Sequence, residues 1–349
     1  MRLVFFNRFY WPDQSATSQL LTDLATALAR RGYTVEIVAS RQLLDDPGAA
    51  LPRHDRHEGV TVRRVKGSRF GRGRLLGRAL DYATYLLGAM QFAATQLRRG
   101  DVAVAMTDPP LLGALLTPFL AWRGVTPIHW LQDLYPEVAT RLAVLRGGSL
   151  LDRVLLAVRN RSLRRARLNV VIGGRMGDHV RRAAGPAARV AVIDNWSADL
   201  PWTPAPAAGN PYRRELGIGD GVLFCYSGNL GRAHRFDELL DAGAQLDADA
   251  GLRFLLIGGG AQFERVRLAA TGLRGWSFLP YQPRARLHES LGAADVHLVT
   301  LEPALEGLIV PSKVFGILAA ARPCVFIGDP DGEVARLLRR HDCGRVVAA

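Results

Sequence analysis

Lysine and cysteine are both scarce in this 349-residue sequence. It contains two lysines, Lys66 and Lys313, beside 43 arginines. Its three cysteines, Cys225, Cys324 and Cys343, are far apart and show no paired spacing. Their number and spacing argue against a disulfide framework and against a cysteine zinc site, and they fit a reducing compartment. We therefore predict a cytoplasmic protein without a bound metal.

Long apolar runs are also missing. A membrane-spanning helix needs about 20 mainly apolar residues. The apolar stretch at residues 80–97 contains Asp81, and the one at residues 111–122 is too short. The apolar run at the N-terminus is likewise too short for a signal peptide and instead predicts a first strand.

Acidic residues are under-represented in the first part of the chain. Residues 1–198 contain 29 Lys and Arg against 15 Asp and Glu, whereas residues 199–349 contain 16 against 17. Basic surface beside apolar helices suits the anionic face of a membrane, and we expect peripheral association with the inner membrane. Plain solvated charge is the alternative. Nucleic acid is another, although no basic stripe interleaved with aromatic residues supports it.

Short apolar runs alternate with segments of helical periodicity along the whole chain. This pattern predicts α/β architecture with parallel sheets covered by helices on both faces. Four prolines between residues 201 and 211 interrupt it, which predicts an interdomain linker. We therefore expect two tandem doubly wound Rossmann-like domains, residues 1–198 and 199–349. The predicted strands are 2–6, 33–40, 60–65, 101–106, 127–131, 168–172, 190–193, 222–228, 252–260, 276–280, 296–300, 323–328 and 344–347.

Ligands of such sheets bind beyond the carboxyl ends of the strands. The loop after the first strand lacks the G-x-G-x-x-G pattern, which argues against a dinucleotide-binding dehydrogenase. In the second domain, Gly228, Asn229, Gly231 and Arg232 lie between a predicted strand and a predicted helix. Small residues, backbone N–H groups and a cation at a helix start predict an anion site. A turn without any ligand is the alternative, as it is for the glycines at 258–260.

Lys313 follows Pro311 and Ser312 at the predicted start of a helix. Proline fits a first helical turn and serine can satisfy an early N–H group, but the macrodipole disfavours a cation at this end. A bound phosphate would reverse that cost, because two positive groups would then share one anion. We therefore predict a phosphate-binding role, with chance placement as the alternative.

Glu302 and Glu306 lie just upstream of Lys313. The predicted fold places ribose hydroxyls near this loop. Carboxylates exposed to solvent are the alternative reading.

The second half of the chain resembles the retaining glycosyltransferases of family 4, which have the GT-B fold. Within that family it is similar to the bacterial branch that builds colanic acid, O-antigen and capsule. The resemblance rests on the motifs YSGNLGRAHRFDELLDA, LLIGGGAQFERVR, FLPYQPRARLHESLGAADVHLV and EGLIVPSKVFGILAAARPCVFIG. In the first half it rests more loosely on PDQSATSQLLTDLATALARRGYTVEIV and WLQDLYPEVA.

The family implies metal-independent transfer of a sugar from a nucleotide donor, without a cofactor and with retention of the anomeric configuration. We expect a UDP-sugar donor, a hexosyl or aminosugar group, and a glycan or polyprenyl-diphosphate-linked acceptor. The donor would bind mostly to the C-terminal domain, and the acceptor would face the N-terminal domain across a cleft. Family members usually continue beyond the last predicted strand, so we expect the terminal helices to be missing here.

The resemblance also places donor-side residues. The family's diphosphate-binding Arg and Lys fall at Asn229 and near His234, so Arg232 and Lys313 would have to supply the positive charge. Glu306 corresponds to the first of the family's two glutamates, and the second falls at Gly316. The resemblance further implies donor contacts for these residues: Gly228, Asn229, Gly258, Gly259, Tyr281, Gln282, Pro311 and Ser312.

The acceptor side falls in the N-terminal domain. The resemblance points to Asp13, Gln14 and Ser15 after the first strand. It also places Gln132 at the family's histidine, with Asp133 next to it as a group that could orient the acceptor hydroxyl. Because no side chain is clearly placed as a covalent nucleophile, we favour front-face transfer. Alternatives are an inverting GT-B transferase, a sugar-nucleotide epimerase and a non-catalytic sugar-nucleotide or membrane-binding protein.

Overall fold

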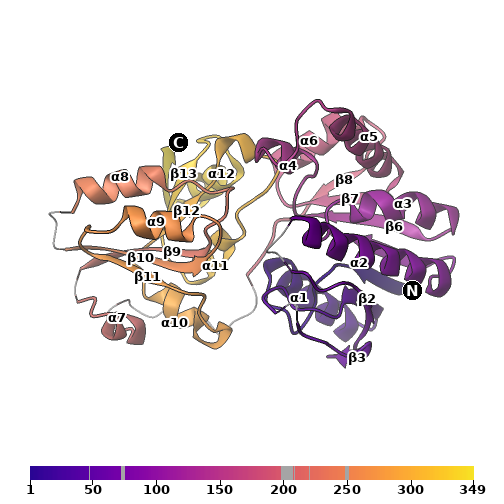
Figure 1. The fold of residues 1–349 in the computed structure, drawn as a ribbon, viewed down its shortest axis with the longest axis horizontal. Helices are drawn as coiled ribbons and strands as arrows, with labels where there is room; N and C mark the ends of the chain where they lie inside the picture. The colour runs from indigo at the N-terminus through magenta and orange to yellow at the C-terminus, as the bar shows by residue number, and fades with distance from the viewer. Residues whose placement is uncertain (47, 72–74, 198–206, 208, 220, 248–250) are drawn as a thin grey trace. The chain divides into compact units, whose positions relative to one another are not determined.

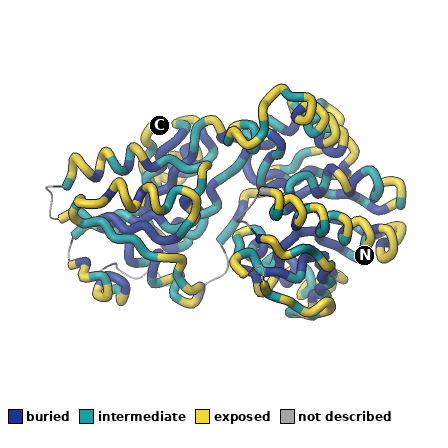
Figure 2. Tube along the Cα trace, viewed as in Figure 1, coloured by how far each residue is buried: buried dark blue, intermediate teal, exposed yellow. Residues whose placement is uncertain are grey.

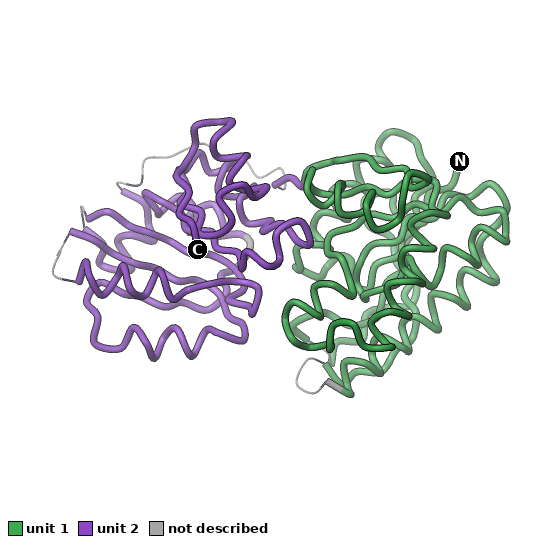
Figure 3. The backbone as a smooth tube through the Cα atoms, turned by 90° about the horizontal axis from the view of Figure 1, so that it is seen from above, with its two compact units in different colours: residues 1–194 green, residues 195–349 purple. Residues whose placement is uncertain are grey.

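The computed structural model describes residues 1–349 except 47, 72–74, 198–206, 208, 220 and 248–250. The chain divides into two compact units, residues 1–194 and residues 195–349 (Figure 3). The predicted boundary between residues 198 and 199 lies outside the described residues. In each unit a mostly buried sheet is covered by helices whose outer sides are exposed (Figure 2).

Unit 1 contains an eight-stranded sheet in the order β3-β4-β2-β1-β5-β6-β7-β8 (Figure 1). Its strands are β1 (Arg2–Phe6), β2 (Thr34–Ser40), β3 (His54–His57), β4 (Val60–Val65), β5 (Val102–Ala105), β6 (Thr126–Leu131), β7 (Leu168–Val171) and β8 (Val190–Val192). Its helices are α1 (Ala16–Arg30), α2 (Leu75–Gln96), α3 (Leu112–Trp122), α4 (Glu137–Arg141), α5 (Leu150–Arg165) and α6 (Gly174–Ala184). Apart from β3, the strand pairs are parallel, as predicted.

Strand β3 is a feature that the sequence pattern missed. It pairs antiparallel with β4 at the sheet edge, with His57 opposite Val60. The two residues between them, Glu58 and Gly59, have positive φ angles of 45° and 84°, as expected for a tight hairpin turn. The four residues of β3 include no apolar side chain, so neither alternation nor an apolar run marks them as a strand.

Unit 2 contains a six-stranded parallel sheet in the order β11-β10-β9-β12-β13-β14. Its strands are β9 (Val222–Asn229), β10 (Leu252–Gly259), β11 (Trp276–Leu279), β12 (Val296–Thr300), β13 (Cys324–Gly328) and β14 (Gly344–Ala348). Its helices are α7 (Pro211–Glu215), α8 (Asp237–Gln245), α9 (Phe263–Ala269), α10 (Leu287–Gly292), α11 (Lys313–Ala319) and α12 (Glu333–His341), with short 3-10 turns η1 (Arg284–Arg286) and η2 (Pro303–Leu305).

Helix α7 falls where the sequence predicted only linker. Asn210 caps it by accepting a 2.8 Å hydrogen bond from the Tyr212 backbone N–H, and Pro211 occupies its first position. This is a common helix-start pattern, which the density of prolines in the region obscured.

The strand order of unit 2 reverses at β9, which has β10 on one side and β12 on the other. Strands β9 and β12 pair at only two positions, Phe224 with Val296 and Cys225 with His297. Their carboxyl ends are therefore not bonded to each other. Such a reversal is the place where open parallel sheets bind ligands.

In the part of the chain that the structure describes, no helix combines the length and the apolar character needed to cross a bilayer.

Candidate active site

Lys313, the first residue of α11, lies at the strand-order reversal of unit 2. Its ammonium donates a hydrogen bond to the hydroxyl of Tyr226, and Nζ lies 3.8 Å from the centroid of the same ring. Tyr226 belongs to β9, one residue beyond the last position where β9 pairs with β12. Its hydroxyl donates in turn to the backbone carbonyl of Asn229 at 2.9 Å. The lysine thus lies against the end of the strand that carries the predicted donor residues.

Burial lowers the pKa of Lys313 to about 7. Near neutral pH the side chain is therefore divided between ammonium and neutral amine, and an anion that binds next to it would raise its pKa again. Among the described residues no carboxylate forms an ion pair with Lys313. The charged form of Lys313 is therefore not balanced by any carboxylate in the part of the chain that the structure describes.

His234 lies beside Lys313 and is neutral. Burial, followed by the nearby Lys313 charge, lowers its pKa to about 3. Its Nδ1 lies within hydrogen-bond distance of the Thr300 carbonyl, which can only accept, so Nδ1 carries the hydrogen and Nε2 is left as an acceptor. The residue at the family's lysine position therefore contributes no positive charge.

Glycines form the sheet edge beside the lysine. Gly228 and Gly258 face each other across β9 and β10, with φ angles of 144° and 143°. A Cβ at Gly228 would lie 3.3 Å from Cε of Lys313, and a Cβ at Gly258 would lie 1.9 Å from the Gly228 carbonyl oxygen. The absence of side chains lets Lys313 reach Tyr226 and keeps the strand ends open to close approach.

Tyr281 and Gln282, predicted to flank the base, have different surroundings. The ring of Tyr281 is exposed and lies over the glycine turn, 3.3 Å from the position of a Cβ at Gly259. Gln282 accepts a hydrogen bond from the Tyr212 hydroxyl and donates one to the Pro280 carbonyl at 2.7 Å. Tyr281 is therefore an exposed aromatic side chain beside the glycine turn, whereas Gln282 is held by its neighbours.

The predicted helix starts near the site need two corrections. Helix α8 begins at Asp237, five residues beyond Arg232. Gly228 and Asn229 are the last two residues of β9, and Arg232 lies in the loop between β9 and α8, so none of the three is at a helix N-terminus. Ser312 is the residue before α11, but its side chain forms no capping bond, and Pro311 precedes the helix. Arg232 is exposed and forms no ion pair with any residue that the structure describes.

Glu306 and Glu302 are both engaged within unit 2. The Glu306 carboxylate accepts a 2.9 Å hydrogen bond from the backbone N–H of Glu333, the first residue of α12. Glu302 forms an ion pair with Arg235 at 3.7 Å. The catalytic role of Glu306 remains a prediction, and in this structure its carboxylate helps to cap a helix.

Hydrogen bonds to the Asp13 carboxylate stabilise the loop after β1. This carboxylate is buried and accepts hydrogen bonds from the N–H and hydroxyl of Ser15 and from the N–H of Leu44. Ser15 precedes α1, and its hydroxyl bonds to Asp13 in place of a helix N–H group. Gln14 is exposed. The acceptor-side roles of these three residues remain predictions.

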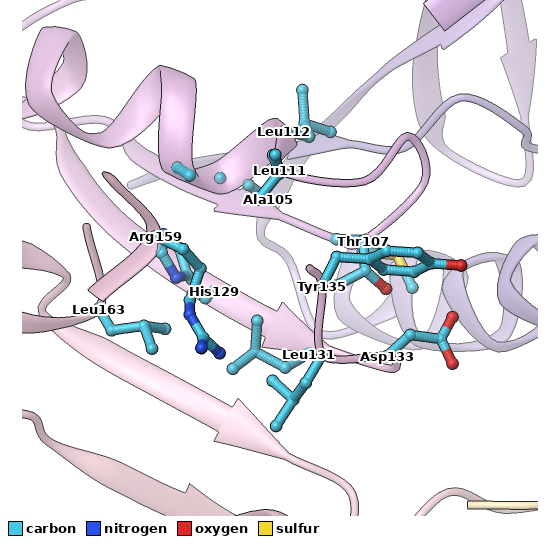
Figure 4. A pocket seen from close by; sticks show the side chains of 14 residues that line it. Ala105, Thr107, Leu111, Leu112, His129, Leu131, Asp133, Tyr135, Arg159 and Leu163 are labelled. Atoms are coloured by element: carbon cyan, nitrogen blue, oxygen red, sulfur yellow. The ribbon is translucent and has the colours of Figure 1, made fainter. Parts of the chain in front are cut away.

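Asp133 lines a pocket of unit 1 at the carboxyl ends of β5 and β6, beside the start of α3. Figure 4 shows Asp133, Tyr135 and Thr107 near one another, with His129 and Arg159 farther along the pocket. Gln132, which replaces the family's histidine, is buried next to it. Of the predicted acceptor-side residues, Asp133 is the one that lines this pocket.

Burial, followed by the nearby Asp108 carboxylate, raises the pKa of Asp133 to about 6. In the unfolded chain an aspartate titrates near 4, so its deprotonation opposes folding once the pH rises above that value. Asp133→Asn should therefore be about 1–2 kcal/mol more stable than the wild type at pH 8, which raises the melting temperature by several degrees. At pH 4 the difference should vanish. Thermal denaturation at the two pH values measures it.

Asp178→Asn is the matched control, because the Asp178 side chain on α6 is largely exposed. It should show no such gain between pH 4 and pH 8. An equal gain in both variants would show that general surface charge is the cause.

Comparison with known proteins shows which family this is. Residues 16–196, just over half of the chain, match the glycosyl transferase 4-like domain. The chain is 30% identical over 290 residues to the probable glycosyltransferase WbjE of Pseudomonas aeruginosa. The matched region covers 80% of this chain and 70% of WbjE. This chain belongs to the family 4 glycosyltransferases. It is a glycosyltransferase of polysaccharide biosynthesis, as the sequence predicted.

A second relative of this glycosyltransferase is the putative colanic acid biosynthesis glycosyl transferase WcaI of Escherichia coli strain K12. It is 29% identical over 155 residues, 43% of this chain and 38% of WcaI. Among solved structures, sucrose-phosphate synthase of Thermosynechococcus elongatus matches 99% of this chain and 86% of its own, with a TM-score of 0.72 at 15% identity. The match to HepE of Anabaena, solved in complex with UDP and glucose, covers 100% of this chain and 86% of the HepE chain. Its TM-score is 0.69 at 16% identity. The predicted GT-B fold is confirmed.

Sequence reasoning missed two features of these sites. Tyr226 positions the Lys313 ammonium, but in the sequence it reads as an ordinary buried strand residue. Arg159 lines the unit 1 pocket and forms an ion pair with Glu137, yet it lies in the arginine-rich part of the chain that the sequence analysis assigned to a basic surface. Burial of a charged side chain in such a helix leaves no local signal.

Proposed function

We propose that this glycosyltransferase transfers a hexosyl or aminosugar group from a UDP-sugar to a glycan or lipid-linked acceptor, with retention and without a metal. The observation that supports it best is Lys313: a half-buried cation at the strand-order reversal, next to a glycine edge and without an ion-pair partner among the described residues. A nucleoside diphosphate supplies the anion that such a site lacks. HepE, which shares the fold, was solved with UDP and glucose.

In the proposed reaction the bond between the sugar's anomeric carbon and the diphosphate oxygen breaks. A new bond to the acceptor oxygen forms on the same face, and the acceptor's proton passes to the leaving phosphate oxygen. Negative charge grows on the diphosphate as the bond breaks, so the Lys313 ammonium, held in place by Tyr226, stabilises the transition state more than the ground state. Arg232 is exposed near the same strand end and would add a second positive charge.

The acceptor would bind unit 1 at the pocket that Asp133 lines. With a pKa of about 6, this carboxylate is mostly ionised at neutral pH and can accept a hydrogen bond from a sugar hydroxyl. In this proposal Asp133 orients the acceptor and is not a nucleophile.

The test is an assay of the full chain with UDP-glucose, UDP-galactose and UDP-N-acetylglucosamine, each with a membrane lipid extract as the acceptor source. Release of UDP with formation of a glycosylated product is expected for one donor, and NMR of that product should show the donor's anomeric configuration. An inverted product would overturn the retaining mechanism. Conversion of the donor into another UDP-sugar would favour an epimerase, and binding without turnover would favour a non-catalytic protein.

A further inference from the structure

Helix α2 has an exposed side that is almost free of charge. Leu76, Leu80, Leu87 and Met90 are exposed and recur at helical spacing. They lie opposite the buried stripe of Tyr85, Ala89 and Ala93, which packs on the sheet. The helix contains two charged residues, and one of them, Asp81, is buried. A surface helix normally presents charged and polar residues on this side.

The two neighbouring helices continue this apolar surface. Helix α3 packs against both α2 and α5. It contains no charged residue, and its Trp122 is 79% exposed. On α5, Leu150 is 78% exposed, and Val154 follows one turn later, also exposed. We call this surface the α2–α3–α5 face, defined by Leu76, Leu80, Leu87, Trp122, Leu150 and Val154.

Arginines border this face, and exposed carboxylates are absent from its helices. The acidic residues of α2, α3 and α5 are Asp81 and Asp152, and both are buried. Exposed basic residues lie at the end of α2 and along α5: Arg98, Arg99, Arg153, Arg161, Arg164 and Arg165. The exposed charge next to these apolar side chains is therefore positive, and most of it lies after the end of α2 and in the last part of α5.

We propose that the α2–α3–α5 face docks on the surface of a bilayer that contains anionic lipids. Exposed leucines and a tryptophan can enter the interface, while arginine side chains reach lipid phosphates. A second copy of the chain fits less well, because a two-fold dimer through this face would bring two clusters of like charge together. This docking is independent of the proposed donor chemistry, and it needs no spanning helix.

The test is co-sedimentation of the full chain with vesicles of phosphatidylcholine alone and with vesicles that also contain phosphatidylglycerol. Wild type should bind the anionic vesicles, and binding should weaken as salt rises. The double variant L80E/L87E should bind at least tenfold more weakly. The affinity of R161Q/R164Q for anionic vesicles should fall about fivefold for each arginine removed, and its affinity for phosphatidylcholine vesicles should not change.

The matched control is L246E/L268E, which makes the same changes at two exposed leucines of unit 2. It should bind like wild type. Equal binding by L80E/L87E and the control, or no binding of wild type to anionic vesicles, would overturn the proposal. So would sedimentation velocity showing a wild-type dimer that L80E/L87E dissociates. No sugar donor is present, so none of these outcomes depends on the transfer reaction.

Discussion

Lys313→Met is expected to lower kcat/KM for sugar transfer by about 10²–10³-fold, the usual loss when one preorganised charge-stabilising group is removed. The variant keeps the length and most of the volume of the side chain. Ligand-free, it should melt no lower than wild type at pH 7, because the desolvation that lowers the pKa of the Lys313 ammonium is not offset by an ion pair with any described residue. Loss of activity without loss of stability would identify Lys313 as a catalytic residue. Steady-state kinetics and thermal denaturation measure the two effects.

Lys66→Met is the natural control, because Lys66 is the one other lysine in the chain and is exposed. It should leave both activity and melting temperature unchanged. Full activity of Lys313→Met would show that the position of Lys313 is an accident of composition.

Gly258→Ala is expected to destabilise unit 2 by about 3 kcal/mol or more. The φ angle of 143° is one that residues with a Cβ rarely adopt, and the new Cβ would lie 1.9 Å from the Gly228 carbonyl oxygen. The strands would have to separate where β9 and β10 end. Since a Cβ at Gly228 would lie 3.3 Å from Cε of Lys313, a shift of Gly228 would also displace the lysine, and affinity for a nucleoside diphosphate should fall as well. Denaturant unfolding and calorimetry would show the two losses.

Gly272→Ala separates the backbone cost from the steric one. Gly272 also has a positive φ angle, 91°, but a Cβ there would meet no atom within 4 Å. Gly272→Ala should lower the free energy of unfolding by only about 1 kcal/mol and leave nucleotide affinity unchanged. Equal losses in the two variants would mean that the contact between strands β9 and β10 is not what requires glycine.

Most of the fold follows from periodicity in the sequence. Apolar runs such as residues 2–6 and 296–300 form the predicted strands, and all pairs but one are parallel. The exceptions are elements without an apolar pattern: β3, which is polar and held by its turn, and α7, which begins inside a proline-rich stretch. Their stability comes from hydrogen bonds and caps that periodicity does not detect.

The site was predictable in its residue types but not in its contacts. The unusual lysine and the glycines at 228 and 258 stood out in the sequence, and the structure brings them together. Burial of Lys313 against Tyr226 and neutrality of His234 depend on β9 and β12 diverging, which only the folded sheet defines. The hydrogen bond between the Glu306 carboxylate and the start of α12 was likewise not predictable, because that helix begins 27 residues later in the sequence.

The most direct test of the central claim is calorimetry of UDP binding at pH 8, in two buffers of different ionisation enthalpy, with wild type and Lys313→Met. Ligand-free Lys313 is mostly neutral at pH 8, so binding a diphosphate beside it should take up close to one proton per site. Affinity should also fall as pH rises above 7. Lys313→Met should take up no proton and bind much more weakly. Equal affinity of the two proteins, with no proton uptake by wild type, would contradict a role for Lys313 in binding the donor.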